Sequence, residues 1–255
     1  MIKGVLLDVG GVVAIGSDPI AGAAQAIANL RAHGVAFRFV TNISRQAHKS
    51  VVASLNQMGF SVQPSEVFTP AVAASAWLKE HGRVPHLLVH PALKEDFAGL
   101  EQGAPDALVV GDAGQDFTYE ALNAAFRLLM DDTPFLALAQ NRYFRDSDGA
   151  LSLDAGAFVA ALEYASGKTA IAMGKPAAAF FQTAVTSMAC QPHEAVMVGD
   201  DAEFDVAPAI AAGLAGILVQ TGKYAPGAET AHNPRPTHVA ADIGEAVDWI
   251  IAQKG

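Results

Sequence analysis

The 255-residue sequence predicts an α/β fold, in which a core with a parallel sheet carries a second, inserted α/β domain. Short apolar runs alternate with helical patterns at both ends of the chain, and this rhythm is typical of parallel strands joined by right-handed crossovers. A middle section has strands and a helix of its own. Because 51% of the residues are apolar, the chain can bury a sizeable core.

The amino-terminal part alternates between strand and helix patterns. Gly4–Val9 is an apolar run that predicts a buried strand, and the pair Gly10–Gly11 ends it. Apolar residues at helical spacing predict helices over 20–30 and 51–58, with a strand over 35–40 between them. The order strand, helix, strand, helix predicts a parallel sheet.

The same rhythm returns near the carboxyl terminus. Three apolar runs, 169–173, 195–198 and 216–219, predict strands, and helical patterns lie between them around 180–188 and 206–212. The loops that follow these strands leave from their carboxyl ends. Open α/β sheets build their binding sites at that edge.

The middle section separates these two parts of the chain. It contains three apolar runs that predict strands, and a helical pattern whose apolar face extends from Tyr119 through Leu122 and Phe126 to Leu129. We therefore predict a discontinuous core domain and a domain inserted into it. The core domain comprises 1–77 and 168–255, the inserted domain comprises 78–167, and its strands are 86–90, 107–110 and 135–138.

The amino-acid composition disfavours two classes of binding partner. The formal net charge is −10, and such an acidic balance disfavours binding to nucleic acid or to an anionic membrane surface. The sequence contains no uninterrupted run of 18 or more apolar residues, so it predicts no membrane-spanning helix. Cys190 is the single cysteine, which excludes a disulfide within the chain and fits a reducing compartment. We expect a cytoplasmic protein.

Polar residues gather where the predicted core strands end. Asp8 closes the first strand, Thr41–Asn42 follow the second, Lys175 follows the run 169–173, and Asp200 with Asp205 follows the run 195–198. A single carboxylate at a strand end is most often part of a turn. The whole set fits a phosphoryl group, which needs its charge neutralised and its attacker aligned. Carboxylates that meet across a sheet edge also need a cation between them.

Four segments in order, LLDVGG, FVTN, GKP and VMVGDDAEFD, resemble the haloacid dehalogenase superfamily. The inserted section falls between the second and third, as in the type II cap arrangement. The segments RFVTN, NRYF, FVAALEYASG and ILVQTGKY resemble the branch that contains phospholysine phosphohistidine inorganic pyrophosphate phosphatase. The resemblance covers essentially the whole chain and implies a Rossmann-like parallel-sheet core with an inserted α/β cap domain.

The resemblance also implies a magnesium-dependent phosphohydrolase. Asp8 would be the nucleophile that forms an aspartyl-phosphate, and a ligand of Mg²⁺. The carbonyl of Gly10 and the carboxylate of Asp200 would be further ligands, and Asp201 is left open as an alternative to its neighbour Asp200. Asp205 would orient the groups around the metal, directly or through water.

The remaining site residues are expected to bind a small phosphorylated substrate. Thr41 and Asn42 would bind the phosphate that is transferred, and Lys175 would neutralise it together with Asp8. Arg142 would clamp a carboxylate or a second phosphate of the substrate, although a solvated cation on a hairpin is an equally good interpretation. Dimers formed between cap domains are also expected from the resemblance.

Gly10 departs from the usual pattern. Most phosphatases of the superfamily carry a second aspartate there, which protonates the leaving oxygen and activates water, and glycine does neither. General acid–base help contributes about 10²–10⁴ in rate, so we expect slow hydrolysis of poor leaving groups. Phosphoramidates, pyrophosphate or aryl phosphates need less protonation. A proton from the substrate, or from His90, Tyr143 or Asp146, is a second possibility.

Two other classes of function compete with a phosphatase. A phosphate-binding or regulatory protein would keep the site and lose turnover at Gly10. A true dehalogenase would attack carbon without a metal, and this would leave Asp200 and Asp205 without a task.

Overall fold

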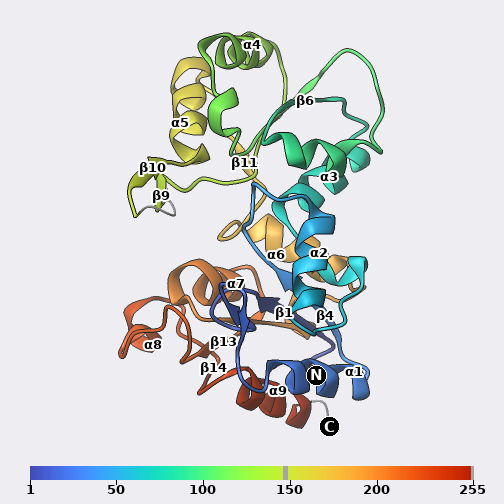
Figure 1. The fold of residues 1–255 in the computed structure, drawn as a ribbon, viewed down its shortest axis with the longest axis vertical. Coiled ribbons are helices and arrows are strands. Elements are labelled where there is room, and N and C mark those ends of the chain that lie inside the picture. Colours follow the sequence, from blue (N-terminus) through green and yellow to red (C-terminus); the bar gives the residue numbers. More distant parts are fainter. Residues whose placement is uncertain (146–148, 254–255) are drawn as a thin grey trace. The chain divides into compact units, whose positions relative to one another are not determined.

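The structure, a computed structural model, describes residues 1–145 and 149–253. The chain forms two compact units: the first contains 1–41, 49–68 and the chain from Lys175 onward, and the second contains 42–48 and 69–174. Each unit combines helices with a parallel sheet, which confirms the predicted α/β class (Figure 1).

The sheet of the first unit has the strand order β14-β13-β12-β1-β4-β5 within the described residues. All its neighbouring strands pair in parallel. Every residue of β1 and β12 is buried, as expected for the central strands of a parallel sheet covered on both faces. The strands are β1 (Gly4–Asp8), β4 (Ala36–Val40), β5 (Val67–Phe68), β12 (Ala195–Gly199), β13 (Ala215–Val219) and β14 (His238–Ala240).

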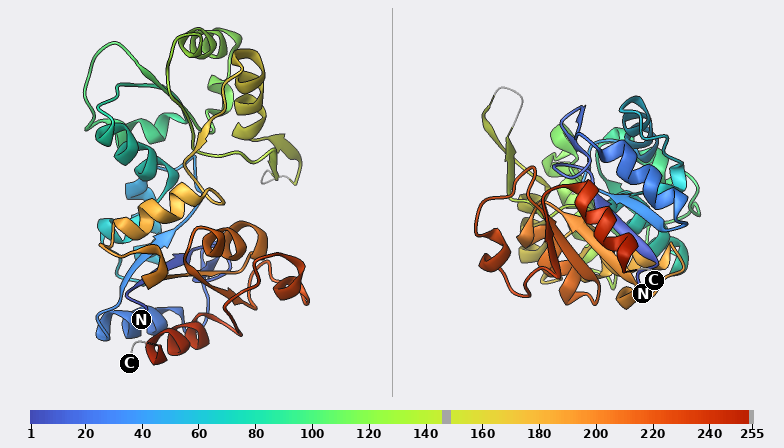
Figure 2. Two further views of the ribbon diagram at one scale, coloured as in Figure 1. Left: turned by 180° about the vertical axis from the view of Figure 1, so that it is seen from behind. Right: turned by 90° about the horizontal axis from the view of Figure 1, so that it is seen from below.

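Helices cover this sheet. Helices α1 and α9 pack side by side, and α6 contacts both β1 and α7 (Figures 1 and 2). The short hairpin of β2 (Ala14–Ile15) and β3 (Asp18–Pro19) follows the glycine turn after β1. The helices are α1 (Ala23–Ala32), α2 (His48–Gln57), α6 (Ala178–Thr186), α7 (Ala207–Ala211), α8 (Ala228–Ala231) and α9 (Ile243–Ala252).

The helix predicted over 206–212 is preceded by a turn of π-helix, η5 (Ala202–Val206), and α7 itself begins at Ala207. The carbonyl of Asp201 accepts from the backbone N–H of both Asp205 and Val206. Pro208 has no N–H, so an ordinary α-helical ladder cannot pass through it. The wider turn carries the Asp205 side chain, which is 1% exposed, into the interior.

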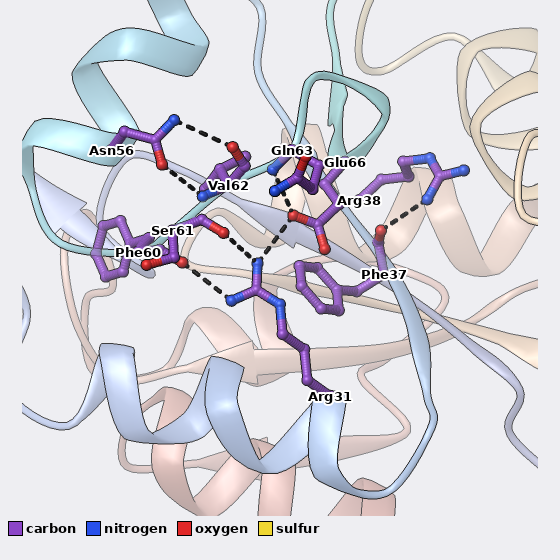
Figure 3. A network of polar contacts seen from close by, with 9 residues as sticks. All are labelled: Arg31, Phe37, Arg38, Asn56, Phe60, Ser61, Val62, Gln63 and Glu66. Atoms are coloured by element: carbon purple, nitrogen blue, oxygen red, sulfur yellow. Dashed lines mark hydrogen bonds and ion pairs between the residues drawn. The ribbon is translucent and has the colours of Figure 1, made fainter.

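Arg31 connects α1 to the loop that leads from α2 to β5 (Figure 3). Its guanidinium donates to the carbonyls of Phe60 at 3.1 Å and Ser61 at 3.0 Å, and to Glu66 Oε2 at 2.9 Å. It also lies over the Phe37 ring, 5.2 Å from the centroid. One cation therefore holds the loop against the sheet at the point where the chain enters β5.

The second unit has a sheet with the order β11-β8-β7-β6 among the described residues. Its core packs Leu108 and Val110 of β7 against Leu129 of α4 and Val159 of α5. The strands are β6 (Pro85–Leu88), β7 (Ala107–Val110), β8 (Phe135–Ala137) and β11 (Ile171–Ala172), with the antiparallel hairpin β9 (Tyr143–Arg145) and β10 (Leu151–Leu153). The helices are α3 (Pro70–Glu80), α4 (Tyr119–Leu129) and α5 (Ala155–Ser166), with 3-10 turns η2 (Pro91–Phe97) and η3 (Gly114–Asp116).

Two sequence expectations for these elements need correction. The strand expected over 169–173 in the core domain is reduced to β11, which pairs with β8 of the second unit. Tyr119 does not lie on the buried face of α4: it is 75% exposed, whereas Leu129 is fully buried. Tyr119 is the first helical residue, and helical side chains lean toward the amino terminus, so its ring points beyond the core. The domain boundaries themselves stay predictions.

Among the described residues, no helix combines the length and the apolar character that crossing a bilayer requires.

Candidate functional site

Three neighbouring strands of the first unit end in polar residues at one edge of the sheet. Asp8 is the last residue of β1, Thr41 follows β4, and Asp200 follows β12. Asp8 is opposite Val40 in the pairing of β1 with β4, so these strands end at the same level. All three side chains are buried, with Asp200 only 2% exposed. The strand ends therefore place the expected residues on one sheet edge.

Asp205 joins Asp8 and Asp200 from the π-turn η5. Ligand oxygens of these three buried carboxylates all lie within 4.8 Å of one another. Gly199 makes this approach possible, because a Cβ at that position would lie 2.4 Å from the Cβ of Asp205. The fold thus brings together three of the four predicted metal ligands.

Lys175 is the cation of this cluster. Its Nζ lies 2.7 Å from Asp8 Oδ1 and 2.7 Å from Asp205 Oδ1, and its side chain is only 6% exposed. Burial alone would lower the pKa of Lys175, but the charges of Asp205 and Asp8 together outweigh burial and raise this pKa above its usual value. The ammonium group is therefore charged at neutral pH and is shared between two carboxylates.

Ionisation is unfavourable for two carboxylates of this cluster, Asp205 and Asp200. Burial, helped by the charge of Asp8, raises the pKa of Asp205 to about 7, against the lowering effect of Lys175. Burial also raises the pKa of Asp200, although the backbone N–H of Lys223 lowers it in part. Three carboxylates face one ammonium, so the cluster favours an additional positive charge.

The residues present fit a bound divalent cation. Asp200 Oδ1 is buried and accepts no hydrogen bond from any described residue, while its Oδ2 accepts from the Lys223 N–H at 2.7 Å. A buried carboxylate oxygen without a partner is costly, and a metal ligand bond removes that cost. Clustered carboxylate oxygens are the donors that hard cations such as Mg²⁺ prefer.

Asp201 and the fourth predicted ligand, Gly10, are not among the three clustered carboxylates. Asp201, which the sequence left open as a ligand, starts the turn η5: its Oδ1 accepts from the N–H of Glu203 at 3.0 Å and of Phe204 at 3.1 Å. Gly10 is exposed, and no described atom lies within 4 Å of the place where its Cβ would be.

Asn42 and Arg142, the other predicted substrate contacts, belong to the second unit. Asn42 is half-buried, and its Oδ1 is 3.0 Å from the position of a Cβ on Gly174. Arg142 is exposed just before β9, and its carbonyl accepts from the Asp154 N–H at 3.3 Å. Their contacts with a substrate stay predictions.

The alternative proton donors also belong to the second unit. His90 Nδ1 accepts from the Ala92 N–H at 3.2 Å and caps η2, so this imidazole has a structural task. Tyr143, on β9, is 59% exposed. Asp146 lies outside the described residues.

The sequence did not point to two groups of contacts. In the first unit, the segment 221–223 after β13 touches Asp200, and the only signal was its place in the motif ILVQTGKY. In the second unit, Arg45 forms an ion pair with Asp112 through two nitrogens and lies over the ring of Phe144. Arg45 follows the FVTN motif by a few residues, but nothing in the sequence identifies its partner.

Comparisons with known proteins agree with the geometry. A family model described as haloacid dehalogenase-like hydrolase matches residues 5–101, and one described as HAD-hydrolase-like matches 172–246. Phospholysine phosphohistidine inorganic pyrophosphate phosphatase of Mus musculus is 39% identical, over 98% of this chain and 94% of its own length. Haloacid dehalogenase-like hydrolase domain-containing protein 2 of Homo sapiens is 40% identical, over 98% and 96%. The crystal structure of 4-nitrophenylphosphatase from Thermotoga maritima is 28% identical with a TM-score of 0.85, over 97% of both chains.

Proposed function

This chain belongs to the haloacid dehalogenase-like hydrolase family, and from that premise we propose that it is a magnesium-dependent phosphatase that attacks small phosphorylated substrates with Asp8. One observation carries the proposal: Asp8 ends the central strand β1 inside a buried cluster of three carboxylates, with the Lys175 ammonium 2.7 Å from its Oδ1. A surface carboxylate that merely closes a turn would have neither the burial nor this partner.

Asp8 would act as the nucleophile in two steps. A carboxylate oxygen of Asp8 forms a bond to phosphorus as the bond from phosphorus to the leaving group breaks, and an aspartyl-phosphate results. Water then cleaves this acyl phosphate, so that inorganic phosphate leaves and the Asp8 carboxylate is restored. Lys175 holds Asp8 in place throughout and offers its positive charge to the phosphoryl oxygens.

The carboxylates of Asp8, Asp200 and Asp205, with the carbonyl of Gly10, would hold Mg²⁺. The ion supplies positive charge that offsets the phosphoryl group's negative charge. Thr41 and Asn42 would donate to phosphate oxygens through a hydroxyl and an amide, and Arg142 would recognise a carboxylate or second phosphate on the rest of the substrate.

Gly10 shapes the proposed range of substrates. The position has room for a side chain but carries none, so it provides no acid for the leaving group. Substrates whose leaving groups need less protonation by the enzyme are therefore favoured, among them aryl phosphates, phosphoramidates and pyrophosphate. The same observation supports a second candidate function, a protein that binds phosphorylated ligands and turns them over weakly.

The test is phosphate release from para-nitrophenyl phosphate, pyrophosphate and a phosphoramidate, each with Mg²⁺ and with EDTA. We expect metal-dependent release by the wild type and background release by Asp8→Asn. Asp248→Asn, at an exposed position on α9, is the matched control and is expected to keep full activity. Failure of the wild type on all three substrates, combined with binding of inorganic phosphate, would favour the second candidate. Failure of both release and binding would refute the proposal.

We also propose that the protein acts in the cytoplasm and forms a homodimer. The lone Cys190, which is buried, suits a reducing compartment. Light scattering coupled to size-exclusion chromatography tests the dimer: a mass near 26.4 kDa, that of one chain, would contradict it.

A further inference from the structure

A short segment after β13, residues 221–223, contacts the metal-ligand candidate Asp200 through its backbone. The N–H of Lys223 donates to Asp200 Oδ2 at 2.7 Å. The side chain of Lys223 is 74% exposed and points to a different residue, Asp201, at 3.4 Å. The contact with Asp200 therefore comes from the main chain, so it depends on the path of the segment and not on the identity of residue 223.

Two glycines enclose the Asp200 carboxylate. Gly222 has φ +60°, and a Cβ there would lie 2.1 Å from Asp200 Oδ2 and 2.5 Å from the Cα of Gly11. Gly11 has φ +77°, and its Cβ would lie 1.9 Å from the same Oδ2. Both backbones are in the left-handed region that favours glycine. A side chain at either position would occupy the space of the carboxylate.

Thr221 links the segment that contains Gly222 to the turn that contains Gly11. Its hydroxyl donates a hydrogen bond to the carbonyl of Gly11, although the two residues are 210 positions apart in sequence. Gly11 belongs to the turn that directly follows Asp8. The segment after β13 is thereby attached to the turn that carries the nucleophile, and Asp200 is held between them.

We propose that Gly11, Thr221, Gly222 and the backbone of Lys223, here called the Asp200 clamp, position Asp200 as a metal ligand. The clamp engages Oδ2 and leaves Oδ1 without a hydrogen bond among the described residues, so Oδ1 is the atom available for a cation. Groups that orient a metal ligand in this way raise the affinity, because the ligand need not be ordered when the metal binds. This inference rests on the proposed function, and its members are positioning residues that do not touch the substrate.

Mg²⁺ binding without substrate tests the clamp, measured by isothermal titration calorimetry on the full chain. Gly222→Ala is expected to weaken Mg²⁺ binding by about 10–100-fold, the usual effect of losing support around a metal ligand. Gly227→Ala is the matched control. Gly227 also has a left-handed φ, +95°, but no described atom lies within 4 Å of its Cβ position. This control is expected to bind Mg²⁺ within about twofold of the wild type.

Thr221→Val is measured in parallel, because it removes one hydroxyl without adding a side chain against Asp200. It is expected to weaken Mg²⁺ binding by about 2–10-fold, the effect of one hydrogen bond. Far-ultraviolet circular dichroism establishes that each variant is folded, and if Gly222→Ala is not, Thr221→Val decides the question. Wild-type affinity in the folded variants would overturn the clamp alone, whereas a wild type that does not bind Mg²⁺ would overturn the metal site as well.

Discussion

Replacing Lys175 by methionine tests the electrostatic account of the site. Methionine keeps much of the length of the lysine side chain and removes its charge. In the structure this charge lies 2.7 Å from carboxylate oxygens of both Asp8 and Asp205, with only 6% of the lysine side chain exposed. The variant would therefore leave two buried carboxylates without their shared cation.

The expected loss of stability follows from that burial. Removing one partner of a buried ion pair costs about 3–5 kcal/mol, because the other charge stays buried and uncompensated. We expect Lys175→Met to lose an amount in this range at pH 8 in EDTA. Lys3→Met is the matched control: Lys3 pairs with Glu194 at 2.6 Å, but its side chain is 56% exposed, so solvent screens this pair and its loss is expected to be much the smaller of the two.

The pKa of Asp205 determines how the loss of stability in Lys175→Met changes with pH. The pKa of Asp205 is already raised to about 7 by burial, and removal of Lys175 takes away a group that lowers it. A carboxylate whose pKa is higher in the folded than in the unfolded state takes up a proton on folding at intermediate pH. Stability is then lost as the pH rises through the folded-state pKa. The deficit of Lys175→Met should thus shrink from pH 8 toward pH 5.

Urea unfolding followed by circular dichroism, in EDTA at pH 5 and pH 8, measures this deficit. A Lys175→Met protein whose free energy of unfolding at pH 8 lies within about 0.5 kcal/mol of the wild type, the range of an ordinary surface substitution, would contradict the electrostatic role of Lys175. A deficit that grew toward pH 5 would contradict the assigned role of Asp205. Equal losses in Lys175→Met and Lys3→Met would show that burial of the pair is irrelevant.

Three further predictions follow from other parts of the first unit. Gly10→Asp meets no described atom within 4 Å of its Cβ and should accelerate hydrolysis of alkyl phosphates by about 10²–10⁴, with little effect on para-nitrophenyl phosphate; equal effects on both would argue against leaving-group protonation. Arg31→Met removes donors to two carbonyls and to Glu66 and should lower the free energy of unfolding by about 1–3 kcal/mol, measured in urea; an unchanged midpoint and slope would contradict the role of this network. Burial raises the pKa of Asp200 and Asp205, so protons compete with the cation for these carboxylates. The Mg²⁺ affinity measured by calorimetry should therefore fall as the pH is lowered from 8 to 6, and a pH-independent affinity would count against these ligands.

Much of the core could be predicted from the sequence, because local patterns determine it. The apolar run that ends at Asp8 became β1 (Gly4–Asp8), and the run before Asp200 became β12 (Ala195–Gly199). A buried parallel strand needs only a short continuous apolar segment with a turn at its end. The sequence alone was therefore sufficient to place Asp8, Thr41 and Asp200 at strand ends, and the order of motifs was sufficient to indicate the family.

The side-chain partners required the tertiary structure. Lys175 is 167 residues from Asp8, and its second partner, Asp205, lies in the π-helical turn η5 after β12. The pairing of β11 with β8 depends likewise on which sheet edge is open when the chain returns. No local pattern encodes such contacts, since they arise from elements that meet only after the sheet has formed.

The Asp200 clamp contains both kinds of information, that which the sequence predicts and that which only the tertiary structure determines. The sequence identified Asp200 as a candidate ligand and Gly11 as part of a turn, and in both cases the neighbouring residues carried the information. That Gly222 must lack a side chain follows only from the sheet order, in which β13 lies beside β12 and β12 beside β1. This order brings the loops after three strands to one edge, where the space left for a Cβ is set by atoms more than 20 residues away in sequence. Local hydrophobic pattern determined the strands and their ends, and the packing of those ends against one another decided the geometry of the site.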